Sequence, residues 1–231
     1  MDKIRERWAA LCSSDQQKIL DKHRYELNFD GNWWQDIYDR FAVDINEHGY
    51  MVNSTSGRGE RQCIWFSGFS SQGDGACFDG YVWGWAKVLE KYPALLSLRE
   101  EGGMKLSWES RGNYSHSNTL VFSDSFEPEN NYSPTEDRLR YLARESLIAE
   151  AEAEWGALVN HTMKHVKELC DGLYRTLETE NYWLSDDEQV LETLIASEML
   201  GDELKEYEDD DDDDEQESSG PTDCCTDSST A

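Results

Sequence analysis

This 231-residue sequence has no long apolar run and few basic residues. A membrane-spanning helix needs about 20 consecutive apolar residues, and no stretch comes near that length. The first residues, MDKIRERWAAL, carry too many charges for a signal peptide, so we expect a cytoplasmic protein. Only 21 lysines and arginines stand against 49 aspartates and glutamates, which gives a formal net charge of −28.

The acidic charge extends over the whole chain. Residues 201–231 hold 14 acids and one lysine, but the first 200 residues still hold 35 acids against 20 bases. Such a charge repels nucleic acid and anionic membranes, because basic patches supply the affinity for both. We therefore expect no direct binding to nucleic acid or membrane, and partners that present a basic surface or cations.

The sequence also lacks paired cysteines and the common catalytic motifs. None of its six cysteines forms a C-x-x-C pair, so we expect free thiols, no metal site and no cofactor. P-loop, G-x-S-x-G and dinucleotide-binding motifs are absent. His161 and His165 stand four residues apart, as in a chelating pair. Further ligands are not identifiable, so we interpret both as solvent-facing residues of a helix.

Apolar residues at helical spacing predict two short helices at the N-terminus and an amphipathic helix over residues 33–49, which Gly49 ends. Another helix is predicted over residues 86–100. Ser133-Pro-Thr-Glu predicts the start of a long C-terminal helix with a break near Gly156. A second capping box, Ser185-Asp-Asp-Glu, predicts a final helix through about Met199.

From Tyr50 the hydrophobic period changes to two, which is typical of strands. The pattern predicts an α+β fold with an antiparallel β meander of four to five strands, packed with the N-terminal helices and the long C-terminal helix. We expect a single domain over residues 1–200 and a disordered acidic tail over residues 201–231. The predicted strands are residues 50–54, 62–69, 76–85, 104–110 and 113–123.

The segment CIWFSGFSSQGDGACFDG, residues 63–80, raises the question of whether its polar loop is structural or catalytic. In the structural interpretation, the loop joins two strands near Ile64 and Phe78. Gly73 and Gly75 can take positive φ angles, which we expect at one of them at least, and Asp74 accepts a local backbone amide. This interpretation explains every residue of the turn, and the sequence favours it.

The catalytic interpretation stays open. It uses Asp74 as a general base or metal ligand, with Ser71 and Gln72 as hydrogen-bonding groups near His116 of the neighbouring hairpin. Polar loops held on a rigid sheet are common places for function, and the four residues are therefore candidate catalytic residues.

Aromatic residues around this loop predict a binding surface. The chain has nine tryptophans, and strict alternation along the strands puts some of them on the face away from the core. Exposed tryptophans are typical of interface hot spots. The alternative is a sheet covered by helices on both faces, which would bury them. The candidate binding residues are Trp65, Phe69, Trp83 and Trp85.

Four stretches, in this order, resemble a family of small proteins encoded by bacteriophages, prophages and plasmids: WWQDIYDRF, CIWFSGFSSQGDGACFDG, GNYSHSNTL and LYRTLETENYWLSDDEQVLETLIASE. The resemblance covers Trp33 to Met199, and SGFSSQGDGA is its most specific part. Some members carry the label antitoxin of a toxin–antitoxin stability system. The resemblance implies a mobile-element origin and the host-cell cytoplasm, without a mechanism. The aspartate run and Cys224-Cys225 depart from the family pattern.

Three functions of different classes are compatible with the sequence. The first is a non-enzymatic phage protein that binds a basic host or phage protein, including one that normally holds DNA, as a DNA mimic would. The second is a small metal-assisted hydrolase or nucleic-acid-modifying enzyme centred on Asp74 and His116. The third is an antitoxin, which rests on the family label alone. The missing enzyme motifs favour the first.

Overall fold

The computed structural model describes residues 2–29, 31–55, 61–99, 103–111 and 115–205, and it divides into two compact units. Unit 1 combines residues 1–31 with residues 182–231, and unit 2 spans residues 32–181. Most of the predicted acidic tail, including Cys224 and Cys225, lies outside the described residues. Both ends of the predicted 1–200 domain belong to unit 1, whereas the sheet belongs to unit 2.

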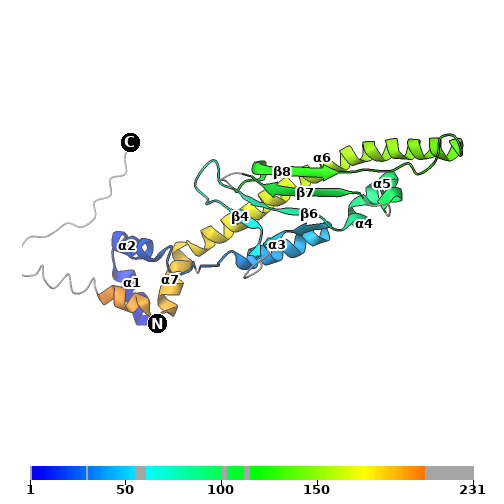
Figure 1. Ribbon diagram of the computed structural model, residues 1–231. Coiled ribbons are helices and arrows are strands. Elements are labelled where there is room, and N and C mark those ends of the chain that lie inside the picture. The colour runs from blue at the N-terminus through cyan, green and yellow to red at the C-terminus, as the bar shows by residue number, and fades with distance from the viewer. Residues whose placement is uncertain (1, 30, 56–60, 100–102, 112–114, 206–231) are drawn as a thin grey trace, which may run out of the picture. The chain divides into compact units, whose positions relative to one another are not determined.

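Unit 2 is built on a four-stranded antiparallel sheet with the order β1-β6-β7-β8 (Figure 1). The strands are β1 (Tyr50–Val52), β6 (Gly80–Val82), β7 (Lys105–Ser110) and β8 (Leu120–Ser125). Along β7, Leu106 and Trp108 are buried while the other residues of the strand are more exposed. This period of two is the pattern from which the sequence predicts a half-buried strand, and the predicted α+β class with an antiparallel sheet is confirmed.

Two shorter pairs flank the sheet, and one predicted strand is broken. β4 (Ile64–Phe66) pairs with β5 (Ala76–Phe78), and β2 (Ser54–Thr55) pairs with β3 (Arg61–Gln62). The strand predicted over residues 76–85 divides at Asp79 into β5 and β6. The Asp79 carbonyl accepts from the Asn53 amide, its amide donates to the Cys63 carbonyl, and its carboxylate accepts from the Ser110 amide at 2.6 Å. Burial raises the pKa of this carboxyl group.

The helices of unit 2 follow the amphipathic patterns, with shifted ends. The helix predicted over residues 33–49 is α3 (Gln35–Glu47), and Gly49 ends it with φ 82°. The next predicted helix consists of α4 (Trp85–Val88), a 3-10 turn η1 (Leu89–Lys91) and α5 (Pro93–Leu98). A second 3-10 turn, η3 (Ser117–Thr119), precedes β8.

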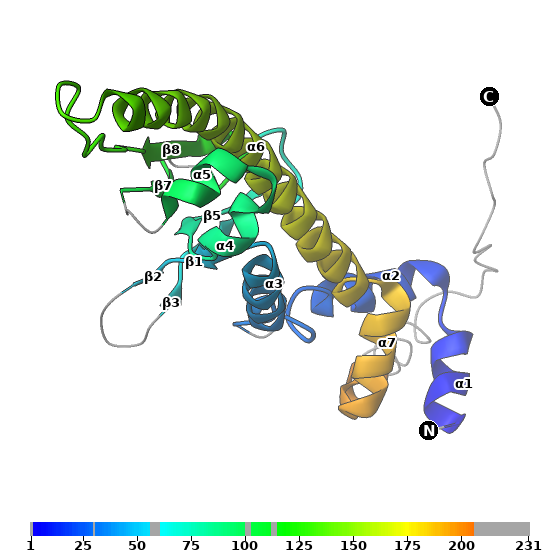
Figure 2. The ribbon, with the colours of Figure 1, turned by 90° about the vertical axis from the view of Figure 1, so that its right-hand side faces the viewer.

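The long helix α6 (Arg138–Leu184) begins later than the capping box predicts, and it continues through Gly156 without a break. Ser133 accepts weak contacts from the Thr135 and Glu136 amides in a separate turn. At the helix start, the Asp137 carboxylate accepts from the Arg140 amide at 3.2 Å, which is the pattern of an N-cap. The helix lies along the sheet in both ribbon views (Figure 1, Figure 2).

The core of unit 2 lies between α3, the strands and α6. Phe78 is at its centre, because its ring meets those of Phe41 and Trp108 edge to face at 5.2 and 5.5 Å. Leu158 and Leu173 of α6 are completely or almost completely buried in the same cluster. Aromatic pairs of this geometry add to the free energy gained by burial of their area.

His161 and His165 are not both solvent-facing, as the sequence analysis expected. His161 is exposed, but His165 is half-buried and contacts Tyr50 and His48. The expectation for His165 was wrong because helical spacing identifies residues that share a face without showing which part of that face meets another element.

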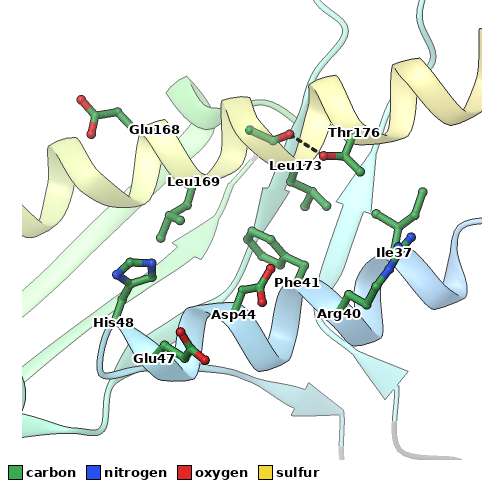
Figure 3. Close-up of a pocket in the computed structure, with 11 residues that line it drawn as sticks. Ile37, Arg40, Phe41, Asp44, Glu47, His48, Glu168, Leu169, Leu173 and Thr176 are labelled. Carbon is green, nitrogen blue, oxygen red and sulfur yellow. Dashed lines mark hydrogen bonds between the residues drawn. The ribbon is translucent and has the colours of Figure 1, made fainter.

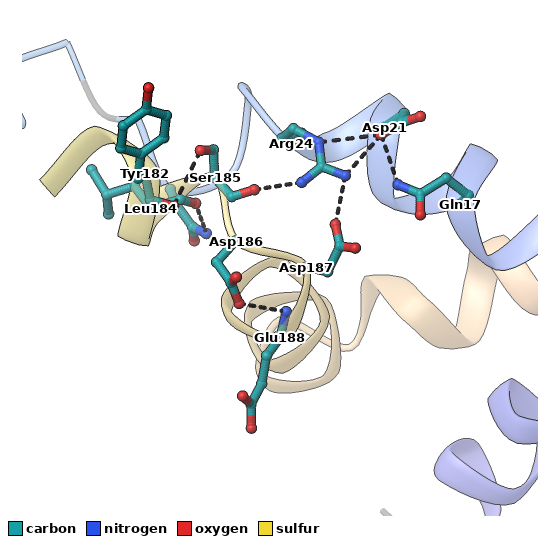
Figure 4. A network of polar contacts seen from close by, with 10 residues as sticks. Gln17, Asp21, Arg24, Tyr182, Leu184, Ser185, Asp186, Asp187 and Glu188 are labelled. Carbon is teal, nitrogen blue, oxygen red and sulfur yellow. Dashed lines mark hydrogen bonds and ion pairs between the residues drawn. The ribbon is translucent and has the colours of Figure 1, made fainter. Parts of the chain in front are cut away.

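Unit 1 is helical and consists of α1 (Asp2–Ala10), α2 (Ser13–His23), α7 (Asp187–Ala196) and a further helical segment over residues 199–205. The two predicted N-terminal helices are thereby confirmed. Arg24, at the end of α2, bridges Asp21 and Asp187 and donates to the Ser185 carbonyl (Figure 4). Asp186 rather than Ser185 caps α7, because its carboxylate accepts from the Glu188 amide at 3.0 Å.

The helical segment of unit 1 extends past residue 200, the predicted start of the tail. Leu200 and Leu204 are buried with Ile19 and Leu20 of α2. Glu203 accepts from Lys22 at 2.9 Å and contacts Nε2 of the buried His23 at 2.8 Å. The predicted tail boundary at residue 201 was too early. The high acid content of the segment indicated a tail, although Leu200 and Leu204 have helical spacing.

Candidate functional site

The loop between β4 and β5 is the candidate site, and its two ends are joined by hydrogen bonds. The predicted hairpin is confirmed, since β4 and β5 pair in antiparallel fashion with Ile64 opposite Phe78. The Ser67 amide donates to the Gly75 carbonyl at 3.0 Å, and the Gly75 amide donates to the Ser67 hydroxyl at 3.3 Å. The loop is therefore an extension of the hairpin rather than a free connection.

Asp74 holds the loop in shape. Its Oδ2 accepts from the Ser70 and Ser71 amides, each at 2.7 Å, and its own amide donates to the Ser71 carbonyl at 3.1 Å. Hydrogen bonds to an ionised carboxylate are short and strong, so this one side chain satisfies two turn donors. Asp74 therefore has the local structural role that the sequence favours, and one of its two carboxylate oxygens is committed to that role.

The glycine geometry differs from the prediction. Among the described glycines, positive φ angles occur at Gly49, Gly68 and Gly103, so the expectation for Gly73 and Gly75 was wrong. Gly68, with φ 72°, packs against Asp74, because a Cβ at this position would lie 3.3 Å from Oδ2 of Asp74. The sequence shows several glycines near the turn, but their φ angles depend on hydrogen bonds that form only in the folded loop.

Gly75 instead allows His116 to pack closely against the loop backbone. A Cβ at this position would lie 2.8 Å from Cδ2 of His116 and 3.0 Å from the Ser115 carbonyl oxygen. His116 therefore packs directly against the loop backbone. Its Nδ1 accepts from the Asn118 amide at 3.0 Å, so the neutral ring carries its hydrogen on Nε2. The catalytic interpretation correctly expected His116 to lie near the loop.

A cavity of about 220 Å³ lies where the loop, His116 and α6 meet. Asp74 and His116 both line it, whereas Ser71 and Gln72 are exposed outside its lining. The sequence does not predict that α6 forms one wall of this cavity. Asp171, Tyr174 and Arg175 have the spacing of one helix face, but nothing local relates that face to a loop about 100 residues earlier. The remaining lining residues are Gly75, Ala76 and Ser117.

The polar groups in this cavity do not form a nucleophilic triad. The Ser117 hydroxyl donates to Asp171 Oδ1 at 3.0 Å and lies 3.5 Å from His116 Nδ1, which the Asn118 amide already occupies. A triad needs the histidine between the hydroxyl and the carboxylate. Within the residues that the structure describes, no three His, Cys, Asp or Glu side chains are placed to hold a metal ion. The arrangement is suited to hydrogen bonding and to charge recognition of a small group.

Phe69 is a packing residue rather than an open binding residue. Its ring stacks on Phe66 at 5.4 Å and lies 5.6 Å from Tyr174 of α6. Trp33 and Trp34, in the turn before α3, join the same cluster. The cluster fixes the loop against the long helix, which is why the nearby cavity has a defined wall.

Trp85 is also a packing residue. It stacks on Trp155 of α6 at 6.0 Å, and Phe126 stacks on the same ring at 5.4 Å. The Trp155 indole donates to Asp124 Oδ2 at 2.9 Å. Trp85 and Phe69 are therefore partly buried and packed within aromatic clusters.

Trp65 and Trp83 are the exposed members of the candidate binding set. Trp83 is 65% exposed and Trp65 is 39% exposed. The backbone under Trp83 is fixed, since its amide donates to the Gly49 carbonyl at 2.9 Å. Trp65 lies in β4, paired with Cys77 of β5. Both indoles are thus presented to solvent from ordered backbone.

The cysteines of the described residues are free thiols. Cys63, Cys77 and Cys170 are buried, and burial raises the pKa of each thiol. Cys12 is exposed, and its thiol donates to Asp15 at 3.0 Å. Thiols with raised pKa values are poor nucleophiles, so the three buried ones act as small apolar residues.

Residues 33–187 match a family model described as a domain of unknown function (DUF8835). The match covers more than half of the chain, and the protein therefore belongs to that family. Searches of curated proteins and of solved structures found no match. The matched residues contain the loop, the cavity and the exposed Trp65 and Trp83 of the candidate binding set. In the described parts of the chain, every helix is too short or too polar to cross a membrane.

Proposed function

We propose that this protein acts by binding another protein through an acidic, tryptophan-bearing surface. Trp83 is the observation that carries the proposal, because a large indole that is 65% exposed on fixed backbone has no role in the core. Exposed tryptophans contribute strongly to interfaces when a partner covers them. Trp65 is a second, less exposed anchor.

The chemistry of the partner follows from the charge. A body of net negative charge attracts basic proteins and speeds their encounter, and it repels nucleic acid and anionic membranes. The resemblance to proteins of phages and plasmids suggests a setting in the cytoplasm of a bacterial host. In that setting the partner is a basic host or phage protein, including one that normally binds DNA.

The test compares variants of the full chain as bait in a lysate of the host bacterium. We expect a basic protein to be retained by the parent and lost with Trp83→Ala, at a cost of about 2 kcal/mol or more in binding. Tyr25→Ala is the matched control, because Tyr25 is 67% exposed but belongs to unit 1. Equal retention by the parent and Trp83→Ala would contradict the proposal.

A second candidate is a small hydrolase at the loop cavity. The observation in its favour is that Asp74 and His116 line one cavity together with Asp171 and Arg175. A positive guanidinium and a histidine beside carboxylates can position a phosphate or carboxylate ester. The test is hydrolysis of p-nitrophenyl phosphate and bis-p-nitrophenyl phosphate with added Mg²⁺ or Mn²⁺. Activity that folded His116→Gln loses would support the enzyme.

A further inference from the structure

A groove of about 520 Å³ lies between α3 and α6, separate from the loop cavity. Its volume is within the range of small-molecule sites, whereas the loop cavity is smaller than that range. The two helices face each other across it in Figure 3. None of the candidate residues from the sequence lines this groove.

The floor of the groove is apolar. Phe41 and Ile37 of α3 and Leu173 of α6 form it, and each keeps only a small exposed fraction. Gly172 provides the space, because a Cβ at this position would meet nothing within 4 Å. An apolar surface with room above it gains free energy when an alkyl chain covers it.

The rim of the groove is acidic. Asp44 and Glu47 of α3 and Glu168 of α6 supply three carboxylates, all exposed. Figure 3 shows the Asp44 carboxylate beside Phe41, near the apolar floor. Glu168 makes a long contact to Lys164, at 3.7 Å.

The cations at the rim do not cancel this charge. Arg40 is the one arginine that lines the described groove, and its Nε donates to the Asp36 carbonyl of its own helix at 3.2 Å. His48 also lines the groove, next to Glu47. Three carboxylates against one guanidinium leave the rim negative, which disfavours anionic ligands.

We propose that this groove binds a small organic cation with an apolar stem, of the alkylammonium or alkylguanidinium class. The stem lies on Phe41 and Leu173, in the space above Gly172. The charged head lies at the rim by Asp44, where it keeps part of its hydration, so that little desolvation opposes binding. This ligand site does not depend on the protein partner proposed above.

The probe is n-hexylammonium, titrated into the full chain labelled with ¹⁵N and followed by amide chemical shifts. We expect saturable shifts at Gly172 and Asp44 with a dissociation constant on the order of 1 mM, because the probe is small and the ion pairs are exposed. The controls n-hexanoate and n-hexanol have the same stem without the positive charge. Equal binding of either control, or no saturable shift with n-hexylammonium, would overturn the proposal.

Two variants test the parts of the site. Asp44→Asn removes the charge at the head and weakens binding by about two- to fivefold, as expected for an exposed ion pair. Asp39→Asn is the matched control, because Asp39 is an exposed carboxylate of α3 outside the groove. Gly172→Leu fills the space over the floor and weakens binding by at least about tenfold.

The remaining outcomes also decide the proposal. Equal weakening by Asp39→Asn and Asp44→Asn would show a general charge effect and overturn it. If Gly172→Leu fails to fold, two comparisons still test the proposal: Asp44→Asn against Asp39→Asn, and n-hexylammonium against n-hexanoate. Trp83→Ala should leave probe binding unchanged, so a failure of the groove and a failure of the protein-binding proposal are distinguishable.

Discussion

The phenolic oxygen of Tyr50 lies within hydrogen-bonding distance of Nδ1 of His165, at 3.1 Å, and the two rings lie 5.5 Å apart. This bond joins the first strand of the sheet to α6. Burial lowers the pKa of His165 below its ordinary value of 6.5, and His48 and His161 lower it further, against the opposing charge of Glu168.

The first prediction is a loss of stability in mild acid. The unfolded chain binds a proton at His165 more readily than the folded chain does, so the free energy of unfolding falls as the pH drops below about 6.5. The slope from this one group is at most about 1.4 kcal/mol per pH unit. Urea unfolding at pH 8, 7, 6 and 5 measures how the free energy of unfolding depends on pH. The slope between pH 6.5 and 5 should become smaller in His165→Gln and change little in the exposed His161→Gln, and the reverse order would refute the assignment.

The second prediction concerns two glycines with opposite surroundings. Gly75→Ala places a methyl group against His116 and the Ser115 carbonyl, and we expect it to destabilise unit 2 by about 1–3 kcal/mol. Gly156→Ala lies in the middle of α6 with nothing within 4 Å, and we expect a gain of about 0.5–1 kcal/mol. Denaturant midpoints of the two variants measure the difference. Equal midpoints would show that the loop yields at Gly75.

The third prediction concerns Asp74. Asp74→Asn keeps an oxygen that can accept the Ser70 and Ser71 amides but loses the negative charge, so we expect a loss of about 0.5–1.5 kcal/mol. Asp74→Ala leaves both amides without this acceptor and should cost more, about 1–3 kcal/mol. Thermal unfolding of both variants measures the order. If Asp74→Asn costs as much as Asp74→Ala, the charge rather than the acceptor geometry maintains the loop.

The fourth prediction concerns the end of unit 1. A chain that stops after Met199 loses the buried Leu200 and Leu204, and each fully buried leucine contributes about 1.5–3 kcal/mol. We expect this chain to unfold at a clearly lower temperature than a chain that stops after Lys205. The second chain should match the full-length protein, because the residues beyond it are mostly acids and small polar residues. Circular dichroism melts of the three chains measure both comparisons.

The sequence predicts the elements better than their junctions. The alternation of apolar residues identifies β7 and the hairpin at Ile64, because local period and burial agree there. It does not identify the break at Asp79, since the alternation continues through it and the cause is a set of hydrogen bonds to Asn53, Cys63 and Ser110. Local pattern cannot show bonds between residues that are distant in the chain.

The same limit applies to the candidate site. The sequence predicts that Asp74 and His116 lie near each other, because they belong to neighbouring hairpins of one predicted sheet, and both line the loop cavity. Asp171 and Arg175 were not found, because the contact between α6 and the loop depends on aromatic packing of Phe69 against Tyr174. Residue types alone did not separate the exposed Trp83 from the stacked Trp85, since both stand in one aromatic run.

Consecutive residues of α6 face two different cavities. Asp171, Tyr174 and Arg175 line the loop cavity, whereas Gly172, Leu173 and Thr176 line the groove against α3. An insertion or deletion of one residue in the preceding part of the helix would rotate all of these side chains by about 100°. Both cavities would then lose their walls in a single event. During divergence this stretch can therefore exchange side chains one by one, but its length must stay constant.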